Sequence, residues 1–219
     1  MPFSSVLGAS SVIKPGVCTS STRPTVPYTG QLIYETDTGK VASWNGSSWV
    51  YTHSSGLVCV KSETAFSAVS SFTADSVFSS NYTNYMIIIR YETSTTNSIS
   101  FKLRASASSA STNYNYQTLA ASDTTLAGAR YTSQTSAFCG HYTNGAFPSL
   151  VTMTLSGPQL AASTQYSAVD SHNLGSMAAI RYGTTVGNHS TATSYDGIEL
   201  LVASGTMTGT YTIYGMAKS

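Results

Sequence analysis

Apolar and polar residues alternate along most of this chain, and Gly, Asn, Ser or Pro interrupts the alternation every few residues. Residues 29–51 show this clearly: they alternate, break at Asp37-Thr38-Gly39, alternate again and break at Trp44-Asn45-Gly46. This pattern predicts two short strands joined by a tight turn, with a third strand at 49–52. Such a small sheet buries little apolar surface, so we expect it to fold against another surface or against copies of itself.

The alternation continues after Gly56 as about eleven strand candidates with turn residues between them. No segment carries the 3.6-residue period of an amphipathic helix over several turns. Regular short strands with turn signals predict an all-β sandwich or a closed barrel. The candidates are residues 57–61, 65–72, 85–91, 99–104, 114–119, 130–138, 150–155, 165–169, 177–182, 198–203 and 210–216.

Two of these segments define the expected core. Residues 85–91 are the most apolar stretch and predict a central strand buried on both faces. Residues 99–104 place three apolar side chains on one face and two basic ones on the other. The predicted core is Ile87, Ile89, Phe101, Leu103, Leu155, Ile180 and Leu200.

The chain is predicted to have two parts. Residues 1–53 comprise an irregular arm, 1–28, and the small hairpin unit; four of the six prolines lie in this arm, where they remove backbone donors. Residues 56–219 form the sandwich, and 53–56 form a hinge between the two parts.

The composition indicates which classes of partner to expect. Charged residues make up 9% of the chain, the net charge is +1 and no basic run occurs, so we expect no nucleic-acid partner. The longest apolar run, 86–89, is far shorter than the ~20 residues needed to span a bilayer, so we expect no membrane insertion. The three cysteines, Cys18, Cys59 and Cys139, are widely spaced and are predicted to be buried, unpaired thiols, which fits synthesis in a reducing cytoplasm.

Signatures of catalysis are missing from the sequence. It contains no GxSxG elbow, HExxH motif or P-loop. Glu35 and Asp37 share a strand face, but Asp37 begins a turn and is expected to bond its own backbone there. Asp196 and Glu199 are three apart and are expected on opposite faces. We therefore predict no enzyme activity and no cofactor.

Metal binding also has little support in the sequence. The histidines are dispersed and are expected to be solvated loop residues: His53, His141, His172 and His189. Cys139 and His141 would share one strand face, but two ligands are too few for a metal site.

Aromatic residues beside amides are the one feature typical of binding. Tyr114 and Tyr116 alternate with asparagines, and Tyr142 lies between a histidine and a threonine. A tyrosine ring can stack on a sugar or anchor an interface while an amide bonds hydroxyl groups. The alternative is that these rings pack on edge strands.

The segment TGQLIYETDTGKVASWNGSSWV resembles one that is common in structural proteins of tailed bacteriophages. The shared elements are the start at Gly30-Gln31, the turn at Asp37-Thr38, and the ending Trp44-Asn45-Gly46-Ser47-Ser48-Trp49, preceded by Thr22-Arg23-Pro24. The remainder, about 56–219, is similar to the β-sandwich knob that accompanies the segment, notably at 77–85 and 209–215.

The resemblance implies a homotrimeric jelly-roll knob held on the virion surface by its N-terminal part. Tyr34, Trp44 and Trp49 are then the expected attachment or oligomerisation residues. The expected partners are other copies of the chain, other virion proteins, and a host-surface glycan or protein.

Three functions remain open from the sequence. The first is a tail fibre or tail-tip protein that contacts the host surface, which the aromatic residues favour. The second is a trimeric capsid decoration protein on the head shell, which compact size favours. The third is a free carbohydrate-binding module.

Overall fold

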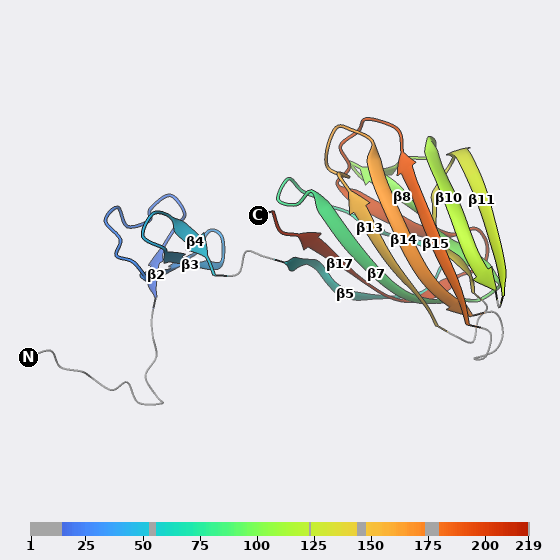
Figure 1. Ribbon diagram of the computed structural model, residues 1–219, viewed down its shortest axis with the longest axis horizontal. Coiled ribbons are helices and arrows are strands. Elements are labelled where there is room, and N and C mark those ends of the chain that lie inside the picture. The colour runs from blue at the N-terminus through green and yellow to red at the C-terminus, as the bar shows by residue number, and fades with distance from the viewer. Residues whose placement is uncertain (1–14, 53–55, 123, 144–147, 174–179, 219) are drawn as a thin grey trace, which may run out of the picture. The chain divides into compact units, whose positions relative to one another are not determined.

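The computed structural model describes residues 15–52, 56–122, 124–143, 148–173 and 180–218. All regular structure in these residues is β-strand, so the predicted all-β class is confirmed (Figure 1). None of the described residues belongs to a helix with the length and apolar character needed to cross a bilayer. The chain divides into two compact units, Met1–Ser55 and Gly56–Ser219.

The small unit is a four-stranded sheet in the order β1-β2-β3-β4. Its strands are β1 (Gly16–Cys18), β2 (Leu32–Glu35), β3 (Lys40–Trp44) and β4 (Trp49–Tyr51). The three predicted strands are present, with the Asp37-Thr38-Gly39 turn between β2 and β3. The prediction of an irregular arm over 1–28 was wrong at β1, which pairs parallel to β2.

The large unit contains an eight-stranded sheet in the order β11-β10-β15-β14-β13-β7-β17-β5, and Figure 1 shows most of these strands side by side. Their bounds are β5 (Leu57–Val69), β7 (Asn84–Thr93), β10 (Tyr114–Ser122), β11 (Thr125–Gln134), β13 (Ser149–Ser156), β14 (Thr164–Asn173), β15 (Ile180–His189) and β17 (Met207–Met216).

A five-stranded sheet in the order β12-β8-β16-β6, with β9 paired to β8, completes the unit. Its strands are β6 (Ser71–Ala74), β8 (Asn97–Ala105), β9 (Ser108–Ser109), β12 (Ala137–Thr143) and β16 (Gly197–Val202). Strand β12 packs across the gap between the sheets against β14 and β15. The inward side chains of both sheets form one buried cluster, an arrangement compatible with the predicted β-sandwich.

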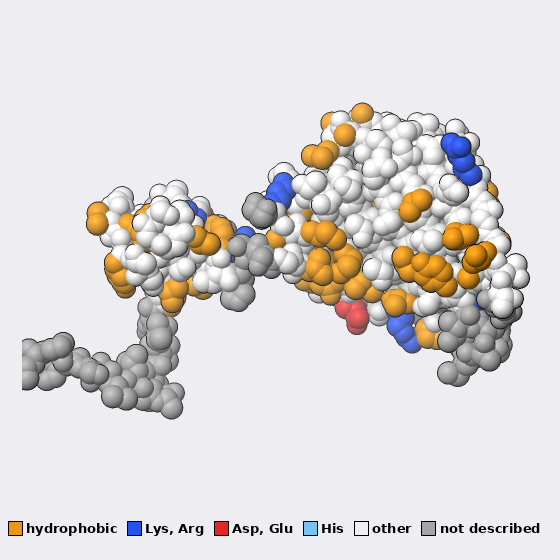
Figure 2. Space-filling model, viewed as in Figure 1, with side chains coloured by type: hydrophobic (Ala, Val, Ile, Leu, Met, Phe, Trp, Pro, Cys, Tyr) orange, Lys and Arg blue, Asp and Glu red, His pale blue; other side chains and the backbone are white. Residues whose placement is uncertain are grey.

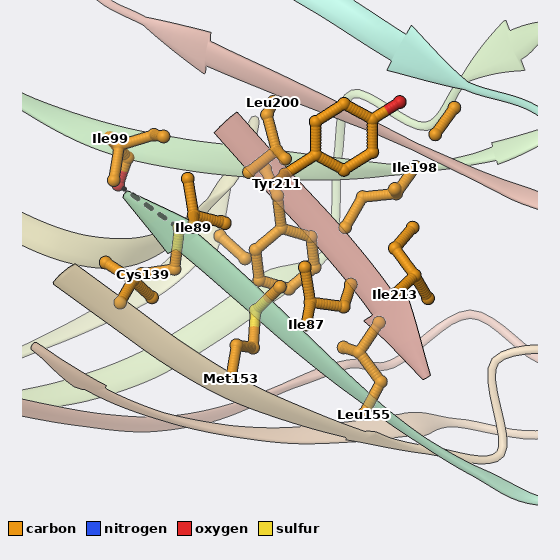
Figure 3. Close-up of a cluster of buried hydrophobic side chains, with 14 of the residues drawn as sticks. Ile87, Ile89, Ile99, Cys139, Met153, Leu155, Ile198, Leu200, Tyr211 and Ile213 are labelled. Carbon is orange, nitrogen blue, oxygen red and sulfur yellow. Dashed lines mark hydrogen bonds between the residues drawn. The ribbon is translucent and has the colours of Figure 1, made fainter. Parts of the chain in front are cut away.

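Six of the seven predicted core residues are buried in this cluster, and the seventh, Ile180, has a side chain outside the described residues. Figure 3 shows Ile87, Ile89, Met153 and Leu155 of the large sheet meeting Ile99 and Leu200 of the small one. The sheets therefore bury apolar side chains at alternate positions, as the pattern of 99–104 predicted.

Three sequence expectations were wrong in detail. Strand β7 buries one face fully, whereas its other face is only partly covered and Arg90 is exposed. The predicted strand 130–138 is two strands, β11 and β12, with a bend between Gln134 and Ala137. The cysteines are free thiols, but only Cys139 is buried; Cys59 is exposed.

Candidate functional site

Strand β12 lies at the edge of the five-stranded sheet and is irregular. Its pairing with β8 shifts register on either side of Gly140, as at a β-bulge. Two buried tyrosines hold its backbone: the Tyr91 hydroxyl donates to the His141 carbonyl (3.2 Å) and the Tyr166 hydroxyl to the Phe138 carbonyl (3.0 Å). These bonds fix His141 where β12 faces β14.

His141, Asp170 and His172 form a buried cluster between the two sheets. Asp170 and His172 alternate along β14 and both face inward, toward β12. The Asp170 carboxylate accepts one bond from each imidazole, 2.7 Å from His141 Nδ1 to Oδ1 and 2.7 Å from His172 Nδ1 to Oδ2. The backbone N–H of His141 donates to Oδ2 at 3.3 Å. The two rings are nearly parallel, with centroids 5.5 Å apart.

The carboxylate of Asp170 is only 1% exposed. Burial acts to raise its pKa, but the hydrogen bonds from His141 and His172 outweigh burial, and the pKa is lowered from its ordinary value. The cluster thus contains a buried carboxylate whose negative charge is stabilised by the two imidazoles. Oxygen and imidazole nitrogen are the donor types that bind transition metals in proteins.

A groove of about 460 Å³ runs from this cluster toward the β10–β11 edge of the large sheet. A row of rings follows it: Tyr131 and Tyr116 (centroids 4.9 Å apart), then Phe138 (6.0 Å from Tyr116), then His141 (4.8 Å from Phe138). Ser98, Ser100, Thr118 and Arg181 also line the groove. Rings beside hydroxyl and guanidinium groups suit a ligand that has both apolar faces and polar edges.

Glycines make room for the cluster. Gly183 of β15 pairs directly with Asp170, and a Cβ there would lie 2.0 Å from His141 Nδ1 and 2.4 Å from Asp170 Oδ1. Gly140 is equally confined, because a Cβ would lie 2.6 Å from an Ile99 methyl carbon. A side chain at Gly183 would displace groups of the cluster, and one at Gly140 would displace core side chains that pack against β12.

The three tyrosines predicted as receptor contacts have different positions in the structure. Tyr114 is fully buried, with its hydroxyl accepting from Leu103 N (2.8 Å) and donating to the Ala110 carbonyl (3.2 Å), so its prediction as a receptor contact was wrong. Both Tyr114 and Tyr116 lie in β10, which contains the strand predicted over 114–119. Tyr116 lines the groove and stays a candidate. The backbone of Tyr142 belongs to β12, but its side chain lies outside the described residues.

The predicted attachment residues lie on both faces of the small sheet. Trp44 and Trp49 are cross-strand partners whose rings meet edge to face at 5.6 Å, on the face that also buries Ile33 and Ala42. Tyr34 projects from the opposite face and is 38% exposed. The tryptophans thus help to build the unit, whereas Tyr34 is available to a partner.

Two of the carboxylates considered in the sequence, Glu35 and Asp37, have structural roles. Glu35 is buried and bonds the Arg23 guanidinium (2.5 Å), the Tyr51 hydroxyl (2.9 Å) and the Thr38 hydroxyl (3.0 Å). Asp37, in the turn, accepts from the backbone N–H of Ser20 at 2.9 Å. Both groups tie the arm to the sheet.

The expectation of solvated loop histidines was wrong for three of the four. His141, His172 and His189 lie buried in β12, β14 and β15, and His53 lies outside the described residues. The sequence signal for burial of these histidines was alternation: Asp170 and His172, like Cys139 and His141, are two residues apart and so share one face of a strand. Only the packing of β12 against β14 joins the two pairs.

Comparison with protein-family models, with curated proteins and with solved structures finds no match for this chain in any of the three.

Proposed function

We propose that this chain is a non-enzymatic structural protein on the surface of a tailed-phage virion, of the tail fibre or tail-tip type. The small N-terminal unit attaches it to the particle, and the large unit presents the groove to the host surface. The resemblance to tailed-phage structural proteins is the reason for proposing a location on a virion. The two units have surfaces suited to attachment and to host contact.

The observation that carries the proposal is an uncovered apolar face on the small sheet. Val17 pairs directly with Tyr34, and Leu32 lies in one cross-strand row with Ser43 and Val50. Since Leu32 and Tyr34 alternate along β2, all these side chains share one face. Val17 is 70% exposed, Leu32 40%, Tyr34 38% and Val50 40%. An apolar face on so small a unit is typical of a docking surface, and exposed apolar side chains of this unit are visible in Figure 2.

The large unit has an apolar outer surface that suits contact between copies. Leu119 on β10, Val169 on β14, and Tyr182 and Val186 on β15 are all at least two-fifths exposed, and Figure 2 shows apolar patches over this sheet with few charges. Low charge means little repulsion between identical chains. We therefore propose a homotrimer with this face toward the neighbouring copies.

A jelly-roll arrangement of the knob belongs to the same proposal. The chain passes repeatedly between the two sheets of the large unit. Strands β6 and β8 lie in the five-stranded sheet, whereas β7 and β10 lie in the eight-stranded sheet. Its first and last long strands, β5 and β17, pair antiparallel. Alternation of this kind supports the jelly-roll assignment.

The groove supports contact with a host-surface glycan. Tyr116 and Tyr131 offer ring faces, and Arg181 with the serines and Thr118 offers partners for sugar hydroxyls. A glycan microarray probed with the full chain tests this role. Tyr131→Ala should weaken any binding at least tenfold, whereas Thr73→Ala, exposed on β6 of the other sheet, should not. Binding that is equal in both variants would place the glycan elsewhere.

Two alternatives differ in measurable ways. A capsid decoration protein would use the same apolar face to sit on the head shell, and hundreds of copies per particle would show it. A tail protein is present in a handful of copies. A free carbohydrate-binding module would bind glycan but be absent from purified particles. Quantitative mass spectrometry of gradient-purified particles separates all three.

A further inference from the structure

The buried cluster His141–Asp170–His172 has the composition of a metal site, independent of any role on a virion. All three ligand atoms lie within 4.8 Å of one another. They come from two strands of two different sheets, β12 and β14, so a bound ion would link the two layers.

Charge is the first reason to expect a cation there. Among the described residues, the ion-pair partners of Asp170 are the two histidines, and no Lys or Arg contacts its carboxylate. A carboxylate taken out of water is costly unless a positive charge or several donors compensate it. A divalent cation bound beside this buried carboxylate would compensate its charge.

Access is the second reason. Gly183 lets the backbone of β15 lie directly against His141 and Asp170, since a Cβ there would collide with both. The cluster also borders the groove through His141 and His172, so water or a small ligand has access to it. Three protein ligands with access to a water-filled space match sites in which the metal keeps an open position.

We propose that His141, Asp170 and His172 bind one divalent first-row transition metal ion, of the Zn²⁺ class. Two imidazole nitrogens and one carboxylate oxygen suit such ions better than Ca²⁺ or Mg²⁺, which prefer oxygen ligands. Around a tetrahedral zinc, ligand atoms are about 3.4 Å apart. The two 2.7 Å contacts must therefore open slightly while the two rings approach each other.

The proton balance of binding is simple. When both imidazoles are neutral and donate Nδ1–H to Asp170, each ring holds its lone pair on Nε2. Coordination through Nδ1 requires the proton to be on Nε2 instead. Each ring keeps one proton, and no redox step occurs.

The test uses the full-length protein treated with EDTA, dialysed and titrated with Zn²⁺ by calorimetry. A Cys59→Ser background removes the exposed thiol as a competing ligand. We expect about one Zn²⁺ per chain and a rise in the unfolding temperature that EDTA reverses. His172→Gln and Asp170→Asn should each weaken binding at least tenfold. His189→Gln is the matched control, because His189 is also buried but bonds Tyr195 instead (3.2 Å), and it should bind as the parent does.

Two results would overturn the site: no saturable Zn²⁺ or Co²⁺ binding by the parent, or equal affinity in His172→Gln and Asp170→Asn. If these variants fail to fold, imidazole ¹⁵N spectra of the parent decide the question. Saturating Zn²⁺ should shift two histidines and move their protons to Nε2, and unchanged histidine spectra would refute the proposal. Co²⁺ absorption bands typical of thiolate ligands would also refute it, because they would place the ion on a cysteine.

Discussion

Ile89 lies at the centre of the large core, at the middle of a strand with paired neighbours on both sides. Ile89→Ala removes three buried carbons and leaves a cavity, which should lower the free energy of unfolding by about 2–5 kcal/mol. Leu150→Ala is the control, since Leu150 is exposed on the neighbouring strand β13. Urea unfolding followed by circular dichroism measures both, and a change under about 0.5 kcal/mol for Ile89→Ala would contradict its burial.

Gly183 shows how one absent side chain permits the cluster. Gly183→Ala forces a methyl group against His141 Nδ1 and Asp170 Oδ1, and overpacking of this kind costs about 1–3 kcal/mol. Gly128→Ala in β11 is the matched control, because its Cβ would meet its nearest neighbour, the Thr118 carbonyl oxygen, at 3.4 Å. Thermal unfolding compares the two. An equal change in unfolding temperature for the two variants would show that the cluster can accept a methyl group at Gly183, contrary to the structure.

Individual residues also show the limits of sequence reasoning. The alternation of Ile99, Phe101 and Leu103 identified buried positions correctly, because side-chain direction in a strand depends on neighbours in sequence. The partnership of His141 with Asp170 depends on how two sheets stack, and no local pattern contains that distance. The histidines were therefore assigned to solvent, although the alternation Asp170-x-His172 was visible in the sequence.

At the scale of elements, the sheet of the small unit depends on a partly buried ion pair between Arg23 and Glu35. The hydrogen bond from Arg23 lowers the pKa of Glu35, with Tyr51 and Thr38 adding to the effect against the opposing effect of burial. A carboxyl group with a lowered folded-state pKa stabilises the fold above its ordinary pKa, and this stabilisation is lost as pH falls through the folded-state value. The small unit should therefore loosen below about pH 4.

Tryptophan fluorescence measures this acid transition selectively, because both tryptophans of the chain lie in β3 and β4. The emission should change below about pH 4 in the parent. In Glu35→Gln the amide keeps the shape but cannot titrate, so the unit should be less stable at neutral pH and this transition should be lost. An identical acid transition in both proteins would assign it to another group.

Elements differ in how well local sequence defines them. The turn at Asp37-Thr38-Gly39 was predictable because Asp and Gly favour tight turns. Strand β1 was not, because its three residues gain their order from parallel pairing with β2, seventeen positions along the chain. The division of 130–138 into β11 and β12 was missed for a similar reason: the two halves belong to different sheets.

At the scale of the whole molecule, the proposed trimer makes a direct prediction. Light scattering on full-length protein should give about three times the chain mass of 23.0 kDa. Val169→Glu with Val186→Glu places charges on the outer face of the large sheet and should shift the protein toward monomer. Thr73→Glu, exposed on β6 of the other sheet, should stay trimeric. A monomeric parent at micromolar concentration would exclude the trimer.

The central claim is that the small unit attaches the protein to a virion through its apolar face. Its most direct test is the amount of this chain in gradient-purified particles of the phage that encodes it, measured by quantitative mass spectrometry. The parent and the control Lys40→Gln should be incorporated equally. Leu32→Ser with Tyr34→Ser should fall at least tenfold while its circular dichroism and unfolding stay those of the parent. Equal incorporation of that variant, or absence of the parent from particles, would contradict the account.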